Sequence, residues 1–313
     1  MNINTVGEIL QFYREKYSLK QSDVCAGICS VSTLSKIENG SKEADSLILE
    51  TLLERIGKEV LQFEMILNDY DYSLWELRIQ IETEIQHDRK ENARQLLLEY
   101  EGKMPQDDNV HSQFVLYHRI LLEDDKRIAD RCAMANQALE YTCPDIEKAV
   151  LFHETEIELI IILVQNRYAE FKNGKERLMS VLKVVQNIYT GRKREQISAK
   201  LLIGLTMLEW NDKNYREAIK CADKAIDVIS HSRSIEYIGE LHHIKAKALE
   251  KCYHETDWNK EEDNCKNECL MSYYIFDIMK NENGKQEVQK FCEEKLQWQI
   301  IKQEILSGLA EIS

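Results

Sequence analysis

Proline and glycine are scarce in this chain, with two prolines and 11 glycines among 313 residues. These two residues interrupt helices most effectively, and the strong helix formers Leu, Glu and Lys are abundant. The composition therefore excludes a fold rich in loops and predicts an all-α protein, long enough for two domains. Long apolar runs are also missing. The run LIIILV at 159–164 is far shorter than the roughly 20 residues of a membrane span, so it predicts a buried helix and no membrane partner.

Positive charge is in short supply as well. The formal net charge is −14, and residues 1–66 carry seven Lys and Arg against ten Asp and Glu. Phosphate contacts supply most of the non-specific affinity for DNA. Binding of DNA would therefore depend on a few well-placed cations and on two copies acting together. The polar N-terminus has no signal peptide, so a cytoplasmic protein is expected, in which the nine cysteines need no disulfides.

Motifs for catalysis are absent. The sequence contains no phosphate-binding loop, no H-E-x-x-H motif and no dinucleotide fingerprint, so neither an enzyme nor a cofactor is expected. Zinc would accept the side chains of Cys252, His254, Cys265 and Cys269. Their spacing fits no standard zinc site, so we assign no metal ligands and leave metal binding by these four residues open.

The N-terminal segment shows a sequence of short helical patterns. Thr5 and Glu8 form a capping box before the first helix, and a second helix starts near Lys20. A tight turn leads into "VSTLSKIE", and Gly40 can take the left-handed conformation that ends a helix. A fourth pattern spans 45–57, with Asp45 or Ser46 as its cap. Two short helices joined by a tight turn predict a helix-turn-helix, whose second helix lies in the major groove of DNA. The alternative is an ordinary amphipathic helix with a glycine stop.

The stretch "LKQSDV…STLSKIENG" resembles the Xre-type (Cro-like) repressor head. The resemblance implies an internal ion pair between Arg14 and Glu38. It also implies that the base-reading positions are Val31, Ser32 and Lys36, and that the phosphate-binding positions are Gln21, Thr33 and Asn39, with Lys42 as a further phosphate candidate. Val31 departs from the long polar residue often found in that family. It can contact only a thymine methyl or contribute shape, so base reading should be modest.

Helix pairs are predicted after the head. In "NDKNYREAIKCADKAIDVI" at 211–229, Tyr215 and three alanines (218, 222 and 225) have the spacing of a tetratricopeptide repeat. Weaker echoes lie near 89–100, 128–141 and 172–188 and in a helix from about 267. Stacked pairs would form an α-solenoid with a concave face suited to a peptide, although an ordinary helical bundle is the alternative. The charge-dense segment 259–268 is expected to be a loop, and 293–312 a long amphipathic helix.

An Xre-type head followed by such repeats resembles the PlcR/PrgX/Rgg (RRNPP) peptide-responsive regulators. The resemblance rests on "GICSVSTLSKIENG" and "YREAIKCADKAIDVISHSRSIEYIGELHHIKAKALEKCY". It implies a homodimeric transcription regulator that binds double-stranded DNA and a short signalling peptide. The expected parts are a DNA-binding domain at 1–66, a linker at 67–74 and a repeat domain at 75–313.

The expected peptide-binding residues lie on the first helices of two successive pairs: Lys200, Ile203 and Met207, then Tyr237, Glu240, His243 and Lys247. Glu240 stands where these relatives carry an amide. Two alternatives remain open for the function of the chain. One is a constitutive Xre-type repressor without a peptide ligand, and the other is a tetratricopeptide scaffold that binds proteins through its acidic surface.

Overall fold

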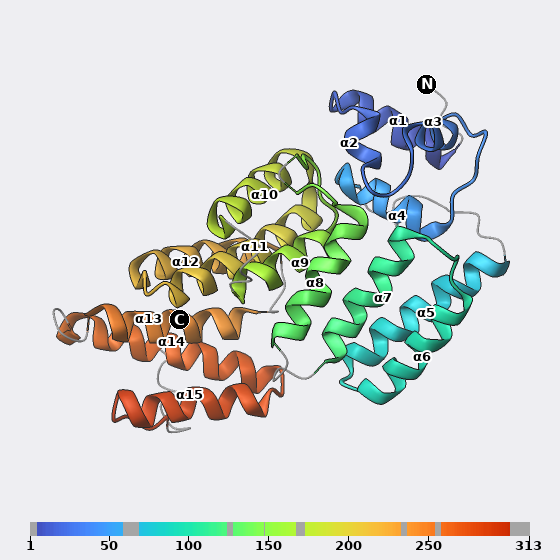
Figure 1. The fold of residues 1–313 in the computed structure, drawn as a ribbon. Helices are drawn as coiled ribbons and strands as arrows, with labels where there is room; N and C mark the ends of the chain where they lie inside the picture. The colour runs from blue at the N-terminus through green and yellow to red at the C-terminus, as the bar shows by residue number, and fades with distance from the viewer. Residues whose placement is uncertain are drawn as a thin grey trace. The chain divides into compact units, whose positions relative to one another are not determined.

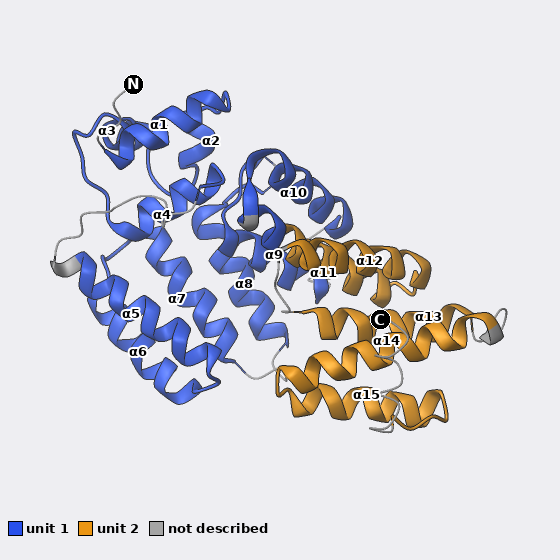
Figure 2. Cartoon of the chain, turned by 180° about the vertical axis from the view of Figure 1, so that it is seen from behind, with its two compact units in different colours: residues 1–197 blue, residues 198–313 orange. Residues whose placement is uncertain are grey.

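The computed structural model describes residues 5–58, 69–123, 128–146, 148–166, 173–232, 237–253 and 258–300. Over these ranges the regular elements are α-helices, α1 to α15 in chain order (Figure 1), which confirms the all-α prediction. They form two compact units, residues 1–197 and 198–313 (Figure 2). The predicted boundary at 66 lies outside the described residues, and residues 69–74 of the predicted linker form the start of α5. The division into domains at 66 and 74 stays a prediction.

Within residues 5–58 the first unit has four short helices: α1 (Val6–Lys16), α2 (Gln21–Cys25), α3 (Val31–Glu38) and α4 (Ser46–Arg55). The predicted capping box is present, because the Thr5 hydroxyl accepts from the Glu8 amide and the Glu8 carboxylate accepts from the Thr5 amide. Asp45 caps α4 by accepting from the Ile48 amide at 3.0 Å. Gly40 follows α3 with φ +71°, in the predicted left-handed conformation.

The core of these four helices continues into later parts of the same unit. Leu10, Leu34 and Leu52 are fully buried and come from α1, α3 and α4. The same apolar cluster includes Val110 and Leu151, which lie well beyond the four helices in the sequence. The N-terminal helices therefore pack on the rest of the unit through shared apolar contacts.

Three helix pairs follow in the described ranges of the first unit. Helix α5 (Asp69–Gln86) packs on α6 (Lys90–Lys103), α7 (Asn109–Leu122) on α8 (Ile128–Thr142), and α9 (Glu154–Gln165) on α10 (Gly174–Ile188). Small residues line the contacts, and Ala93, Ala135 and Ala138 are fully buried. The next helix, α11 (Gly191–Asn211), begins in this unit and ends in the second.

The second unit continues the pattern with α12 (Tyr215–Ser232), α13 (Ile238–Tyr253), α14 (Trp258–Ile278) and α15 (Glu282–Lys295). Ala218, Ala222 and Ala225 of α12 are fully buried, as the repeat spacing predicts. A missing side chain beyond Cβ lets neighbouring helices approach closely. Consecutive helices pack together here too, α12 on α13, α13 on α14 and α14 on α15. The predicted succession of helix pairs is confirmed.

Two sequence predictions about the C-terminal part are wrong. Residues 259–268 form part of α14 and not a loop. The charges stabilise this helix at its surface, as in the Lys266–Glu262 pair at 2.8 Å, while Cys265 faces the core. The predicted helix at 293–312 is not continuous, because α15 ends at Lys295 and Trp298 packs on the core of the unit outside any helix. Residues 301–313 lie outside the described residues.

No helix in the described ranges is long and apolar enough to cross a membrane.

Candidate nucleic-acid interface

The position of α3 is fixed by the predicted ion pair between Arg14 and Glu38. Arg14 Nε donates to Glu38 Oε1 at 2.6 Å, and Nη2 donates to Oε2 at 3.0 Å. The Glu38 side chain is 3% exposed, and the hydrogen bond to it raises the pKa of Arg14. A two-pronged contact of this kind fixes both direction and distance. The pair therefore locks the end of α3 to α1.

Gln21 takes part in the same contact. Its Nε2 donates to Glu38 Oε2 at 2.7 Å, so this side chain stabilises α3 from the start of α2. A phosphate contact by Gln21 would have to use other atoms or displace this bond. Its expected role at DNA stays a prediction.

The residues expected to read bases project from α3 into solvent. Val31 is 46% exposed, and Ser32 and Lys36 are also exposed. Ser32 and Lys36 are four residues apart, so they share one face of the helix. Ser30 caps α3 by accepting from the Thr33 amide at 3.0 Å. The exposed face of α3 thus offers an apolar side chain and a hydroxyl in its first turn and an ammonium group in its last turn.

The phosphate candidates differ in what they can donate. The Thr33 hydroxyl contacts the Ser30 hydroxyl at 3.0 Å and is half-buried. Asn39 Oδ1 accepts from the amide of Ser41 at 3.0 Å and from its hydroxyl at 2.5 Å. Ser41 thus occupies the acceptor atom of the Asn39 amide. Its donor, Nδ2, is the group of the exposed Asn39 that can bind a phosphate. Lys42 is exposed beside it.

Few cations of this region can reach DNA. Arg14 and Arg55 are held in internal ion pairs, and the ammonium group of Lys58 lies 4.0 Å from the centre of the Tyr13 ring. Four exposed lysines remain in residues 5–58: Lys16, Lys20, Lys36 and Lys42. A small number of phosphate contacts gives weak binding by one head. Two heads bound together would be needed for tight binding.

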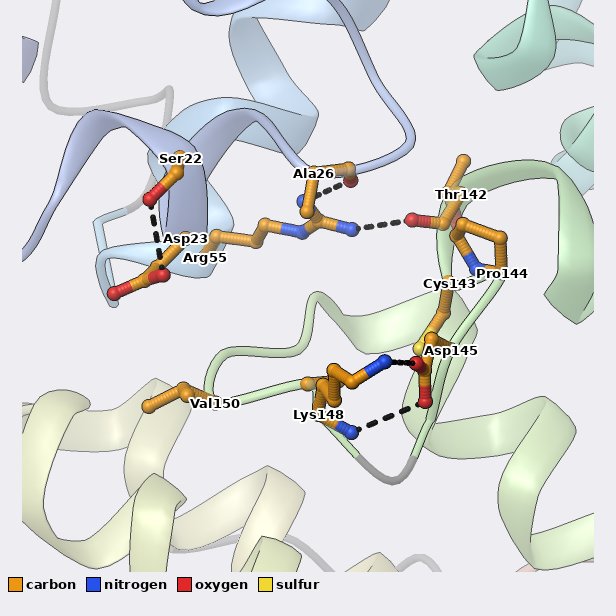
Figure 3. Close-up of a pocket in the computed structure, with 11 residues that line it drawn as sticks. Ser22, Asp23, Ala26, Arg55, Thr142, Cys143, Pro144, Asp145, Lys148 and Val150 are labelled. Atoms are coloured by element: carbon orange, nitrogen blue, oxygen red, sulfur yellow. Dashed lines mark hydrogen bonds and ion pairs between the residues drawn. The ribbon is translucent and has the colours of Figure 1, made fainter.

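Arg55 connects the helix-turn-helix to the helix pairs of the first unit (Figure 3). Its side chain is 2% exposed. Its Nη1 donates to the carbonyl oxygens of Val24 and Ala26 at 3.0 and 2.6 Å. Its Nη2 donates to the carbonyl of Thr142 at 2.9 Å and to Glu156 Oε1 at 2.6 Å. One buried side chain therefore joins α2 to the end of α8 and to α9.

Glu156 is the acidic partner in this contact and is fully buried. Burial alone would raise the pKa of this carboxyl, but Arg55 and His153 lower it overall. The Thr142 hydroxyl donates to Oε1 at 2.7 Å, and the His153 amide donates to Oε2 at 2.9 Å. A buried carboxylate with this many donors is stabilised in its charged form.

The turn between α2 and α3 also touches the helix pairs directly. Gly27 has φ +72°, and a Cβ atom at this position would lie 2.0 Å from the carbonyl oxygen of Thr142. Asn109 Nδ2 donates to the Gly27 carbonyl at 2.9 Å. Beside this contact a cavity of about 210 Å³ opens between Ser22 and Asp23 of α2 and residues 142–145 and 148–150 (Figure 3). The turn that precedes α3 is thus fixed to the start of α7 and to the end of α8.

The residues expected to bind a peptide lie on α11 and at or near α13. Lys200, Ile203 and Met207 are half-buried on α11; Tyr237 precedes α13, while Glu240, His243 and Lys247 lie on it. The structure brings two of them to aromatic side chains of neighbouring elements. The Lys247 ammonium nitrogen lies 5.7 Å from the ring centre of Trp210. The ring centres of His243 and Phe291 are 5.8 Å apart. Sequence reasoning did not select Trp210 or Phe291. The peptide-binding role of all seven stays a prediction.

The cysteines considered as zinc ligands have different surroundings. Cys265 and Cys269 are fully buried in the core of the second unit, together with Cys292. Cys252 is half-buried on α13, and His254 lies outside the described residues. Within the described ranges no group of three or more His, Cys, Asp or Glu side chains is placed to hold a metal ion.

The geometry defines a class of protein, one with a helix-turn-helix followed by stacked helix pairs. Residues 10–63 match the family model described as "Helix-turn-helix". A search of curated proteins finds no match. The solved structure of PlcR from Bacillus thuringiensis with the peptide PapR7 and DNA is similar, with a TM-score of 0.57 and 15% sequence identity. That match covers 91% of this chain and 99% of PlcR.

The apo form of Bacillus thuringiensis PlcR is similar too. Its TM-score is 0.52 at 16% identity, and the match covers 90% of this chain and 97% of PlcR. At this level of identity the likeness concerns the fold. The chain therefore has the fold of PlcR along nearly its whole length.

Proposed function

We propose that the protein is a transcription regulator that binds double-stranded DNA as a homodimer. The observation that carries the proposal is the face of α3, where Val31, Ser32 and Lys36 project into solvent while Arg14 and Glu38 hold the helix from behind. Short side chains at the start of such a helix let its backbone approach the major groove, and one long cation can reach a guanine.

We also propose that the helix pairs bind a short signalling peptide that changes the affinity for DNA. PlcR, which has the same fold, is seen with a peptide and with DNA in one complex, and this supports the proposal. The four exposed lysines of one head bind DNA weakly, so the spacing of two heads decides the affinity. A peptide can change the affinity for DNA only if it binds more tightly to one spacing of the two heads than to another. The free energy that couples two such binding events is typically about 1–3 kcal/mol.

The contacts of Arg55 and Gly27 support such a coupling. They fix the turn before α3 to Thr142 at the end of α8. A head held in this way follows the helix pairs of its own unit as a rigid body, so a change in their packing changes where α3 points. A head on a flexible tether would not transmit such a change.

Footprinting on the region upstream of the protein's own gene tests the proposal. We expect a protected site for the wild type that is lost when Ser32 and Lys36 are both replaced by alanine. A response of that site to peptides secreted by the source organism supports the peptide-responsive regulator. Tight binding that no peptide changes would indicate the constitutive repressor, and no protected site would indicate the protein-binding scaffold.

A further inference from the structure

One lysine of the second unit lies in unusual surroundings. Lys247 on α13 is half-buried, and in the described part of the chain no carboxylate oxygen lies within 4 Å of its ammonium nitrogen. The other partly buried lysine of this helix behaves differently, because Lys245 contacts both Asp223 and Glu268 at 2.6 Å. Glu287 is the acidic residue that acts on Lys247 from a longer distance.

This placement destabilises the charged form of the Lys247 side chain. Burial lowers the pKa of Lys247, and the distant Glu287 only partly offsets it. The ring of Trp210, 5.7 Å from the ammonium nitrogen, supplies a weak cation–π contact. A lysine removed from water normally finds a carboxylate partner. Among the described residues, the partly buried charge of Lys247 is therefore not balanced by a nearby carboxylate.

A second buried polar group that needs a hydrogen-bond partner lies on the same face of α13, one turn before Lys247. His243 is 6% exposed, and its buried Nε2 atom has no hydrogen-bond partner among the residues that the structure describes. Burial and, to a smaller extent, the charge of the nearby Lys247 lower the pKa of His243 to about 3. The imidazole is thus neutral at pH 7, and Nε2 can donate one hydrogen bond. Buried polar groups without a partner are rare and call for an explanation.

We propose that His243 and Lys247 form a carboxylate-binding point that receives a carboxylate of the bound peptide. The inference rests on the proposed peptide-binding function and specifies its chemistry. A carboxylate oxygen can accept from the ammonium of Lys247 and from Nε2 of His243 at once, because residues four apart lie side by side on a helix. Trp210 and Phe291 flank the two groups with apolar surface, which excludes water and strengthens the charge-assisted bonds.

Both sources of a peptide carboxylate fit this chemistry, the C-terminus and an Asp or Glu side chain. Affinity selection with the full-length protein separates them, using three pools of random seven-residue peptides. The first pool has free C-terminal acids and lacks Asp and Glu. The second has C-terminal amides and contains Asp and Glu. The third has C-terminal amides and lacks both acidic residues.

We expect the wild type to retain peptides from the first or the second pool and not from the third. The variants Lys247→Met and His243→Phe should each retain at least roughly tenfold less peptide than the wild type, because each loses a hydrogen bond to a charged group. The matched control is Lys224→Met, an exposed lysine of α12 in the same unit, and it should retain as much as the wild type. Thermal unfolding verifies that each variant is folded. Lys247→Met should melt no lower than the wild type, because it removes a poorly solvated charge.

Two results contradict the inference in distinguishable ways. If the wild type retains peptides equally from all three pools and Lys247→Met does not change this, the protein binds peptides but not through a carboxylate at His243 and Lys247. Retention from no pool by the wild type removes the proposed peptide function, and this inference with it.

Discussion

Arg55 of α4 and Glu156 of α9 are 101 residues apart in the sequence and form a buried hydrogen-bonded ion pair at 2.6 Å. Both side chains are almost fully shielded from water, at 2% and 0% exposure. A charge in such a position is stable only with its partner. The pair therefore makes the orientation of the helix-turn-helix depend on α9, a helix of the first unit's helix pairs.

Breaking this pair should strongly destabilise the first unit. Arg55→Met or Glu156→Gln leaves one buried charge without its partner, which costs about 3–5 kcal/mol. Urea unfolding of the full chain measures the loss. The double variant should lose less than the sum of the two single losses, because no unpaired charge remains. Additive losses would show that the two side chains do not interact.

The Arg14–Glu38 pair should behave in the same way on a smaller scale, because Arg14 is partly exposed to solvent. Replacement of either residue by alanine should lower the melting temperature of the full-length protein, and the double replacement should lower it by less than the sum. The full chain is the appropriate sample because the head shares its core with Val110 and Leu151. Lys16→Ala, an exposed change on the same helix, serves as the control. Strict additivity would contradict the pairing.

Lys36 and Lys42 should contribute to DNA binding in different ways. If Lys36 contacts a guanine, Lys36→Ala should lose roughly 1–3 kcal/mol of discrimination at one base position in each half-site. Lys42→Ala should weaken binding to all sequences and reduce the salt dependence by about one phosphate contact per head. Binding to a set of single-base variants at two salt concentrations measures both effects. Uniform weakening by Lys36→Ala would reassign Lys36 to a phosphate.

The protein should lose stability as the pH falls from about 6.5 towards 4. Burial lowers the pKa of His118 to about 4, below the value of about 6.5 for an unfolded histidine. Between these values only the unfolded chain binds the proton, so the stability that is present at pH 7 is lost on acidification. At pH 5 the loss from one such histidine is on the order of 1–2 kcal/mol.

Urea unfolding of the wild type and of His118→Leu at pH 7.5 and pH 5 measures this effect. The midpoint of the variant should fall less between the two pH values than that of the wild type. Equal decreases would show that His118 has an ordinary pKa in the folded protein.

The sequence predicted local features well and distant contacts poorly. The capping box of Thr5 and Glu8, the left-handed Gly40 and the buried alanines of α12 all follow from spacing within one helix or turn. The Arg14–Glu38 pair was predicted because it accompanies a recognisable motif. Arg55 and Glu156 belong to no shared motif, so nothing in the sequence brings them together. Segment 259–268 was misjudged because most of its charges lie on the outer face of α14, while its inner face is formed by few residues, among them Cys265 and the buried Glu268.

The candidate sites show the same limit. The motif placed Gln21 at the start of α2 but could not show that its side chain binds Glu38. Likewise, the repeat spacing selected Lys247 and His243 but not Trp210 or Phe291, which come from other helices. A pattern in one segment gives a residue's position and leaves its partners from other segments undetermined.

Selection from a library of randomised DNA duplexes tests the central claim most directly, that two heads read one site together. Recognition helices of a symmetric dimer enter successive major grooves on one side of the DNA, roughly 34–36 Å apart. The account predicts that the full-length protein enriches an inverted repeat with half-sites at this spacing, and that the double variant Ser32→Ala, Lys36→Ala enriches no repeat. Enrichment of no motif by the wild type, or of a single half-site bound as tightly as the pair, would contradict it.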